Sequence, residues 1–68
     1  MTITLYREGT LLRDRLGALW MITGFCRDDL FRRKPNAYVL QRLADVGTVG
    51  VVAAYRIVHR QMELVSEA

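Results

Sequence analysis

Residues 18–25 read Ala18-Leu19-Trp20-Met21-Ile22-Thr23-Gly24-Phe25, and this stretch decides the fold class. In an extended chain, Trp20 and Ile22 fall on one face, while Leu19, Met21 and Thr23 fall on the other. Gly24 predicts a bulge or a sharp bend at which a small sheet curls. Because both faces carry apolar side chains, we predict a well-packed strand whose outer face is also covered.

Shorter segments on both sides of this strand show the same extended character. The alternation and the β-branched residues predict strands over residues 2–6, 10–13, 37–43, 48–52 and 62–65. Turns are predicted at residues 14–17 and 44–47, with Gly17 free to adopt a positive φ. The sequence therefore predicts a mostly β domain of about five short strands.

Residues 53–61 are the ambiguous part of this prediction. Ala54, Tyr55, Val58 and Met62 share one face at helical spacing, which predicts one or two helical turns over residues 53–59. A rival interpretation makes residues 37–43 and 49–62 two helices of a helix-turn-helix, in which case DNA binding would be the leading function. The run of valines and glycines near residue 50 favours strand instead.

Length and charge limit the function classes. A chain of 68 residues is enough for one domain over residues 1–68, and it folds with little margin unless it gains burial, for example as a homodimer. Ten Lys and Arg against seven Asp and Glu give a net charge of +3, which suits an acidic protein or a nucleic acid. Nine of the ten cations are arginine, whose guanidinium binds carboxylates and phosphates with two hydrogen bonds more readily than lysine does.

Cysteine usage and hydropathy indicate a compartment. Cys26 is the only cysteine, so no intrachain disulfide can form, and we expect a reducing cytoplasmic environment. The longest apolar stretches, residues 17–25 and 49–55, are too short to cross a membrane. The N-terminus has neither a basic start nor an apolar core segment, so we expect no secretory leader.

A basic loop is the strongest functional feature. Residues 26–36 form a long loop for so small a protein, and long loops are often functional. We predict a partner-binding patch made by the loop cations and by two arginines four residues apart on the helical turn: Arg27, Arg32, Arg33, Lys34, Arg56 and Arg60. The alternative is a solvated surface that keeps the protein soluble.

An apolar strand face is the second candidate. Leu19 and Met21, with Leu40 as a further member, would be exposed in a monomer. Exposed apolar patches often mark interfaces, so we predict that Leu19 and Met21 lie in an interface, with self-association as the simplest account.

Catalytic and metal-binding residues are not evident in the sequence. His59 and Cys26 lie far apart and lack partners at ligand spacing, so we expect no metal, no cofactor and no activated thiol. Asp28 and Asp29 are adjacent and point apart, which is unlike a catalytic carboxylate pair. We expect Trp20 to pack in the core and His59 to lie on the surface or at a helix end.

Residues 11–25, Leu11-Leu12-Arg13-Asp14-Arg15-Leu16-Gly17-Ala18-Leu19-Trp20-Met21-Ile22-Thr23-Gly24-Phe25, carry a resemblance to a known group. They resemble the opening hairpin of small SH3-like β-barrel proteins encoded by phages and other mobile elements, and residues 37–65 match the later elements. The resemblance implies a compact SH3-like barrel that works as an accessory or inhibitor by binding a host protein.

Type II dihydrofolate reductase, a plasmid-borne SH3-like barrel that is active only as a tetramer, is a more specific comparison. Residues 17–20 and 47–54 are similar to its order of elements. In that family the strand that corresponds to residues 49–52 carries a glutamine and a tyrosine that line the shared pore. Here those places hold Gly50 and Val52, whose side chains cannot hydrogen-bond a pterin or a nicotinamide, so we do not carry the activity over.

The sequence therefore predicts a non-enzymatic binding module for a host or bacterial protein. A nucleic-acid-binding protein that uses the same cations is the alternative, and an oligomeric reductase is a remote one.

Overall fold

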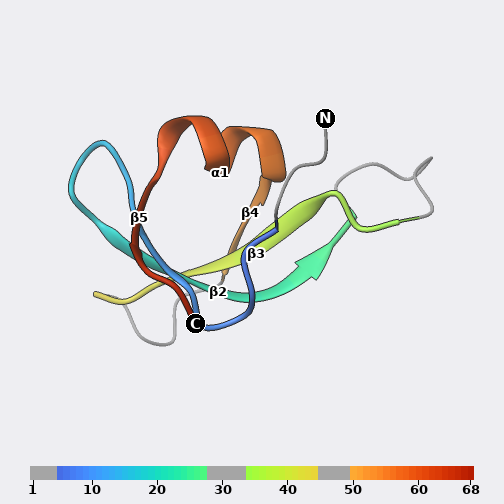
Figure 1. Cartoon of the computed structure of the whole chain (residues 1–68), viewed down its shortest axis with the longest axis horizontal. Helices are drawn as coiled ribbons and strands as arrows, with labels where there is room; N and C mark the ends of the chain where they lie inside the picture. Colours follow the sequence, from blue (N-terminus) through green and yellow to red (C-terminus); the bar gives the residue numbers. More distant parts are fainter. Residues whose placement is uncertain (1–4, 28–33, 45–49) are drawn as a thin grey trace.

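Residues 5–27, 34–44 and 50–68, which the computed structural model describes, form one antiparallel sheet and one short helix (Figure 1). The elements in chain order are β1 (Leu11–Arg13), β2 (Leu19–Cys26), β3 (Ala37–Arg42), β4 (Val51–Ala54), α1 (Tyr55–Gln61) and β5 (Glu63–Ser66). The strand order is β4-β3-β2-β1-β5, so β4 and β5 are the two edges of an open sheet. The mostly β prediction is confirmed.

β2 holds the sheet together because it pairs with β1 on one side and β3 on the other. The register with β3 shifts between Ile22 and Gly24, which confirms the predicted bulge. The irregularity changes the alternation of side chains, so Phe25 pairs with Tyr38 and their ring centroids lie 5.7 Å apart. The bulge thus lets one strand supply both Ile22 and Phe25 to the same side of the sheet.

The core lies between the sheet and α1, which covers one face of it (Figure 1). We call this the helix-side face. Its buried residues are Leu12, Ile22, Tyr38, Leu40 and Val58. Trp20 is half-buried and packs against this cluster, which agrees with its predicted place in the core.

α1 depends on packing rather than on capping. It has seven residues and no side-chain cap at its N-terminus, and a helix this short is not stable alone. Val58 is fully buried, and Tyr55 and Met62 pack on the core. Three of the four residues predicted to share a helical face therefore do pack α1 against the sheet. The Tyr55 backbone N–H donates to the Asn36 carbonyl, which ties the start of α1 to the end of the β2–β3 loop.

The β1–β2 connection is the predicted tight turn. Gly17 adopts φ +87°, and its N–H donates to the Asp14 carbonyl. The Asp14 N–H in turn donates to the Ala18 carbonyl. The positive φ explains the need for glycine at this position.

Several predicted boundaries are wrong. Of the strand predicted at 48–52, residues 48 and 49 lie outside the described residues and Gly50 is not in a strand, while β4 runs from Val51 to Ala54. The helix occupies 55–61 instead of 53–59. Ala53 and Ala54 extend because they pair with Tyr38 and Ala37, and this ladder outweighs the helix preference of alanine. The helix-turn-helix alternative is wrong, because residues 37–42 and 51–54 are strands.

The ends of the chain also differ from the prediction. Leu5 and Tyr6 are not in a strand, and the rest of the predicted strand at 2–6 lies outside the described residues, as does most of the predicted turn at 44–47. The closing strand is Glu63–Ser66, one residue later than predicted.

Candidate binding groove

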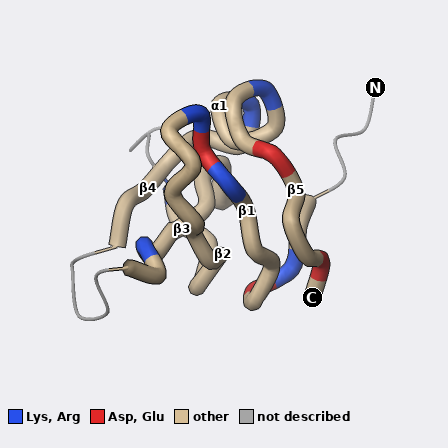
Figure 2. The backbone as a smooth tube through the Cα atoms, turned by 90° about the vertical axis from the view of Figure 1, so that its left-hand side faces the viewer, with Lys and Arg blue, Asp and Glu red and all other residues tan. Residues whose placement is uncertain are grey.

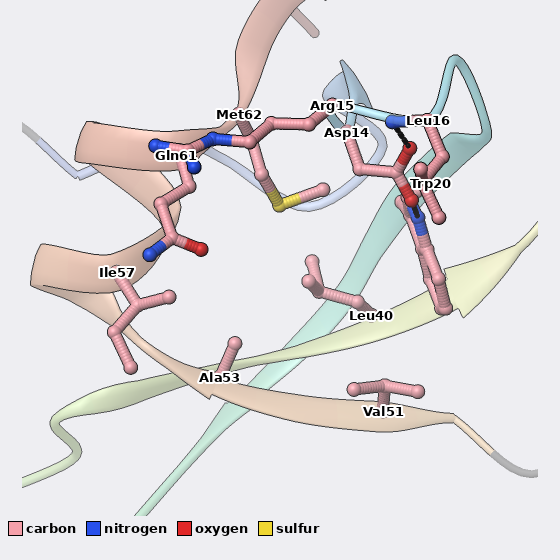
Figure 3. Close-up of a pocket in the computed structure, with 10 residues that line it drawn as sticks. All are labelled: Asp14, Arg15, Leu16, Trp20, Leu40, Val51, Ala53, Ile57, Gln61 and Met62. Atoms are coloured by element: carbon pink, nitrogen blue, oxygen red, sulfur yellow. Dashed lines mark hydrogen bonds between the residues drawn. The ribbon is translucent and has the colours of Figure 1, made fainter.

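An apolar groove opens on the helix-side face, between the β1–β2 turn, β4 and α1 (Figure 3). Its volume is about 270 Å³, and it is open to solvent along one side. Ten residues line it: Asp14, Arg15, Leu16, Trp20, Leu40, Val51, Ala53, Ile57, Gln61 and Met62. The β1–β2 turn, β2, β3, β4 and α1 with its C-cap therefore all contribute to one hollow.

Large apolar side chains at the edge of the groove are unusually exposed. Leu16, at the tip of the β1–β2 turn, has 94% of its surface exposed, while Val51 and Ile57 have 44% and 43%. Scattered apolar residues are normal on protein surfaces, but three that surround one hollow are typical of a binding site. The groove therefore presents apolar contact area that the fold itself does not use.

Asp14 builds the wall of the groove on the side of the turn. One carboxylate oxygen, Oδ1, accepts the backbone N–H groups of Leu16 and Ala18, both at 2.9 Å. The other, Oδ2, accepts the indole Nε1–H of Trp20 at 2.9 Å (Figure 3). The bond from Trp20, followed by that from Ala18, holds the pKa of the Asp14 carboxyl below its ordinary value of 3.8. One side chain thus sets both the shape of the turn and the orientation of the indole ring.

Arg15 is the cation of the groove. Its side chain extends from the turn in the direction of α1 (Figure 3). No ion pair joins Arg15 to any residue that the structure describes, and the neighbouring Asp14 carboxylate already accepts three hydrogen bonds. The groove therefore offers a guanidinium beside an apolar hollow.

An aromatic cluster packs in and beside the core, and none of its rings lines the groove. The Tyr38 hydroxyl accepts the Tyr6 backbone N–H at 2.8 Å and lies 3.2 Å from His59 Nε2. Burial raises the pKa of the Tyr38 phenol, and it also raises that of Tyr55, whose ring centroid lies 4.5 Å from that of Tyr38. His59 lies in the last turn of α1, as predicted for a helix end, but it is half-buried beside Tyr6 rather than on the surface.

The predicted cation patch lies only partly within the described residues. Arg32 and Arg33 are outside them, while Arg27, Lys34, Arg56 and Arg60 are exposed. Figure 2 shows cationic positions on α1 and along the β1–β2 hairpin, which also carries an acidic position between two cationic ones, and further acidic positions on β5 and near the C-terminus. The hydrogen bond between Asn36 and Tyr55 brings the end of the basic loop to the start of α1.

The predicted apolar strand face is less exposed than expected. Leu19 and Met21 are half-buried on the face of the sheet opposite α1. Leu40 does not join them: it pairs with Ile22, lies on the helix-side face and is 2% exposed. The prediction of an exposed Leu40 was wrong because Leu40 pairs directly with Ile22 and therefore shares its face of the sheet.

Metal-binding groups, the single thiol and membrane spans form a separate set of sequence predictions. Among the described residues there is no cluster of three or more His, Cys, Asp or Glu side chains suited to a metal ion. Cys26 is a free, half-buried thiol. In the part of the chain that the structure describes, no helix has the length and apolar character needed to span a bilayer.

Sequence reasoning missed the groove because its residues are scattered. Val51 and Ile57 were assigned only to a strand and a helix, and nothing in their spacing predicts that both stay exposed beside Trp20. Leu16 carried a usable signal: it is a large apolar residue at the centre of a tight turn between Asp14 and Gly17, where a polar residue is usual.

Comparisons with protein-family models, with curated proteins and with solved structures found no match for this chain.

Proposed function

We propose that this protein is a non-enzymatic binding module of SH3-like architecture, which binds a partner protein through the apolar groove. The observation that carries the proposal is the exposure of Leu16, Val51 and Ile57 around a hollow of about 270 Å³. Burying such side chains against a partner would contribute the apolar contact area that stabilises most protein interfaces.

The element order supports the SH3-like part of the proposal. Five short antiparallel strands follow one another, and the single helix of the described residues lies between β4 and β5. The barrel would be an incomplete one, with β4 and β5 as its unjoined edges. The resemblance of the β1–β2 hairpin adds the proposal that the partner is a host protein and that the module is an accessory or inhibitor from a phage or mobile element.

The chemistry of the groove supports binding rather than catalysis. Asp14 is its one carboxylate among the described lining residues, and three hydrogen bonds already hold it in its ionised form. A general base needs a carboxylate with a pKa nearer to neutral and with room for the substrate proton. Asp14 is thus better suited to holding the turn and Trp20 in place.

A selection of short peptides from a display library, with the folded protein as bait, tests the proposal. Selected peptides should lose affinity by about tenfold or more against Leu16→Ser, because an apolar anchor is removed from the interface. Leu16 is 94% exposed, so this variant should fold like the parent.

Leu64→Ser is the matched control for this comparison. Leu64 is an exposed leucine on β5 outside the groove, 42% exposed, and its replacement should change the affinity by less than about twofold. A library that yields no binder, or binders that are equally insensitive to both changes, would rule out the groove as the binding surface.

Nucleic-acid binding is the second candidate, favoured by Arg56 and Arg60, which are both exposed and lie four residues apart on α1. Binding to DNA or RNA would weaken steeply as the salt concentration rises. Fluorescence titrations at low and high salt, with the parent and with Arg56→Gln/Arg60→Gln, would detect it. Binding that is independent of these arginines would count against this candidate.

A further inference from the structure

We infer that the groove and the free edge of β4 form one docking site for an extended, acidic segment of a partner protein, which pairs with β4 as a sixth strand. This inference rests on the proposed function, because it names the kind of partner that the same groove receives. It is carried by the hydrogen-bonding direction of β4, by the exposure of its side chains and by the charge of Arg15.

The backbone of β4 directs hydrogen-bonding groups outward at Val52. Asn36 and Tyr55 continue the register in which Ala37 pairs with Ala54, and the Tyr55 N–H donates to the Asn36 carbonyl at 3.2 Å. Hydrogen-bonded pairs alternate along an antiparallel ladder, so Val51 and Ala53 bond toward β3. The N–H and C=O of Val52 therefore point to the outer edge, which pairs with no strand among the described residues.

The side chains of β4 place this edge directly beside the groove. Val51 and Ala53 both line the groove, whereas Val52 lies on the opposite face and is 48% exposed. An added strand alternates in the same way, so every second side chain of the partner would lie at the groove and the others beside Val52. Backbone pairing would supply affinity, and the groove would select the alternate side chains.

β4 is short, with four residues, but it lacks two other features that protect edge strands from pairing. Its sequence is Val51-Val52-Ala53-Ala54, with no charged residue and no proline. Natural edge strands are commonly blocked by lysine, proline or a bulge. An unblocked, partly exposed edge beside an apolar hollow is a suitable template for an incoming strand.

Charge complementarity indicates an acidic partner segment. Arg15 lines the groove without an ion pair to any described residue, and the whole chain carries a net charge of +3. A carboxylate on the incoming strand could form a bidentate pair with this guanidinium.

The size of the groove favours side chains of a protein over a free small molecule. Pockets that enclose drug-sized ligands have volumes of about 300–1,000 Å³ and bury most of the ligand. A hollow of about 270 Å³ lies just below this range and is open to solvent, and it has room for one or two apolar side chains.

The test uses a capped synthetic peptide that alternates leucine with threonine and carries a glutamate at each end. It is titrated into the ¹⁵N-labelled protein, and the affinity is measured from the shift of the Trp20 indole N–H signal. Two further peptides carry N-methyl groups on the leucine amides or on the threonine amides, since in a strand only one of these two sets can face β4.

An added strand predicts an asymmetric result. One N-methylated peptide should bind about tenfold more weakly, because it loses the hydrogen bond that it donates to the Val52 carbonyl and its methyl groups clash with the edge of β4, and the other should change by less than about twofold. Equal effects of the two methylations would overturn strand pairing. A parent peptide that leaves the Trp20 signal unmoved would also overturn the inference, while the proposed function is judged separately by the Leu16→Ser comparison.

The role of Arg15 is tested with a peptide in which glutamines replace the glutamates. This change should weaken binding severalfold to the parent protein and to Arg56→Gln, but not to Arg15→Gln. Equal weakening in all three proteins would overturn the acidic contact at Arg15.

A second copy of the chain is the rival occupant of the edge. Sedimentation of the free protein that shows a dimer, lost on the change Val52→Pro, would assign the β4 edge to self-association and overturn the inference. A monomer at all concentrations agrees with an edge that is kept for a different partner.

Discussion

The Tyr38 hydroxyl joins three parts of the molecule through one oxygen atom. It accepts the backbone N–H of Tyr6, before β1, and contacts His59 on α1, while its own ring is fully buried on β3. Because a buried polar group without a partner is costly, this hydroxyl fixes how α1 and the segment before β1 lie on the sheet.

Tyr38→Phe should lower the free energy of unfolding by about 1–2 kcal/mol, because the Tyr6 N–H and the His59 ring lose their partner. Urea unfolding monitored by circular dichroism measures the change. Tyr55→Phe is the matched control: the described residues offer no hydrogen bond to the Tyr55 hydroxyl, so its loss should cost less than about 0.5 kcal/mol. Equal costs for the two variants would contradict this role of Tyr38.

Asp14 couples the stability of the groove wall to pH. Its folded-state pKa is lowered, chiefly by the Trp20 indole, so its contribution is present above 3.8 and is lost as the pH falls through the lower folded value. The parent should therefore exceed Asp14→Asn in thermal stability at pH 5, and the difference should shrink as the pH is lowered toward about 2.

Thermal unfolding of both proteins across this range checks the pH dependence of Asp14. The other carboxyl groups titrate in both proteins and so largely cancel in the difference. A difference that stays constant or grows on acidification would show that the Asp14 carboxylate does not hold the turn and Trp20.

At the scale of the elements, β4 is the strand on which the docking argument depends. The backbones of Val51 and Ala53 bond to β3, whereas the N–H of Val52 points away from β3. A proline removes one N–H and is tolerated in sheets only where that N–H faces away from the ladder. Proline substitutions at Val51 and at Val52 therefore test which of the two backbone N–H groups points toward β3.

Val51→Pro should destabilise the protein by about 3 kcal/mol or more, whereas Val52→Pro should cost far less, because only the former removes a bond to β3. Chemical unfolding of the two variants measures the difference. Comparable losses, or a greater loss for Val52→Pro, would mean that the free edge of β4 is oriented differently.

The sequence predicts the elements better than their limits. Alternation around Trp20, the bulge at Gly24 and the turn at Gly17 were all readable, because each follows from local sterics and periodicity. The start of α1 could not be predicted from the sequence, because Ala53 and Ala54 prefer helix locally and become strand only through pairing with β3. Such non-local pairing leaves no trace in a short window of sequence.

The candidate site could be predicted even less well. The groove joins Leu16, Val51 and Ile57, which are far apart in sequence and close only in the folded chain. The sequence shows which residues are charged, but which of these charges lie together depends on how the chain folds. Arg15 was overlooked as a candidate, although it adjoins Leu16, because one arginine in a turn is ordinary.

At the scale of the whole molecule, three surfaces compete for the role of binding site. They are the groove on the helix-side face, the half-buried strand face with Leu19 and Met21, and the cations Arg27, Lys34, Arg56 and Arg60 near the loop and α1. These surfaces involve different backbone amides. A residue-by-residue map of ligand contacts can therefore distinguish them in one experiment.

That map is the most direct test of the central claim: a ¹H–¹⁵N correlation spectrum recorded while a library-selected peptide is added to the labelled protein. The account predicts that the largest shifts occur at the Trp20 indole, at Leu16, at residues 51–53 and at Ile57. Shifts that are concentrated at Leu19 and Met21, or at the four cations, with the Trp20 indole unmoved, would contradict it.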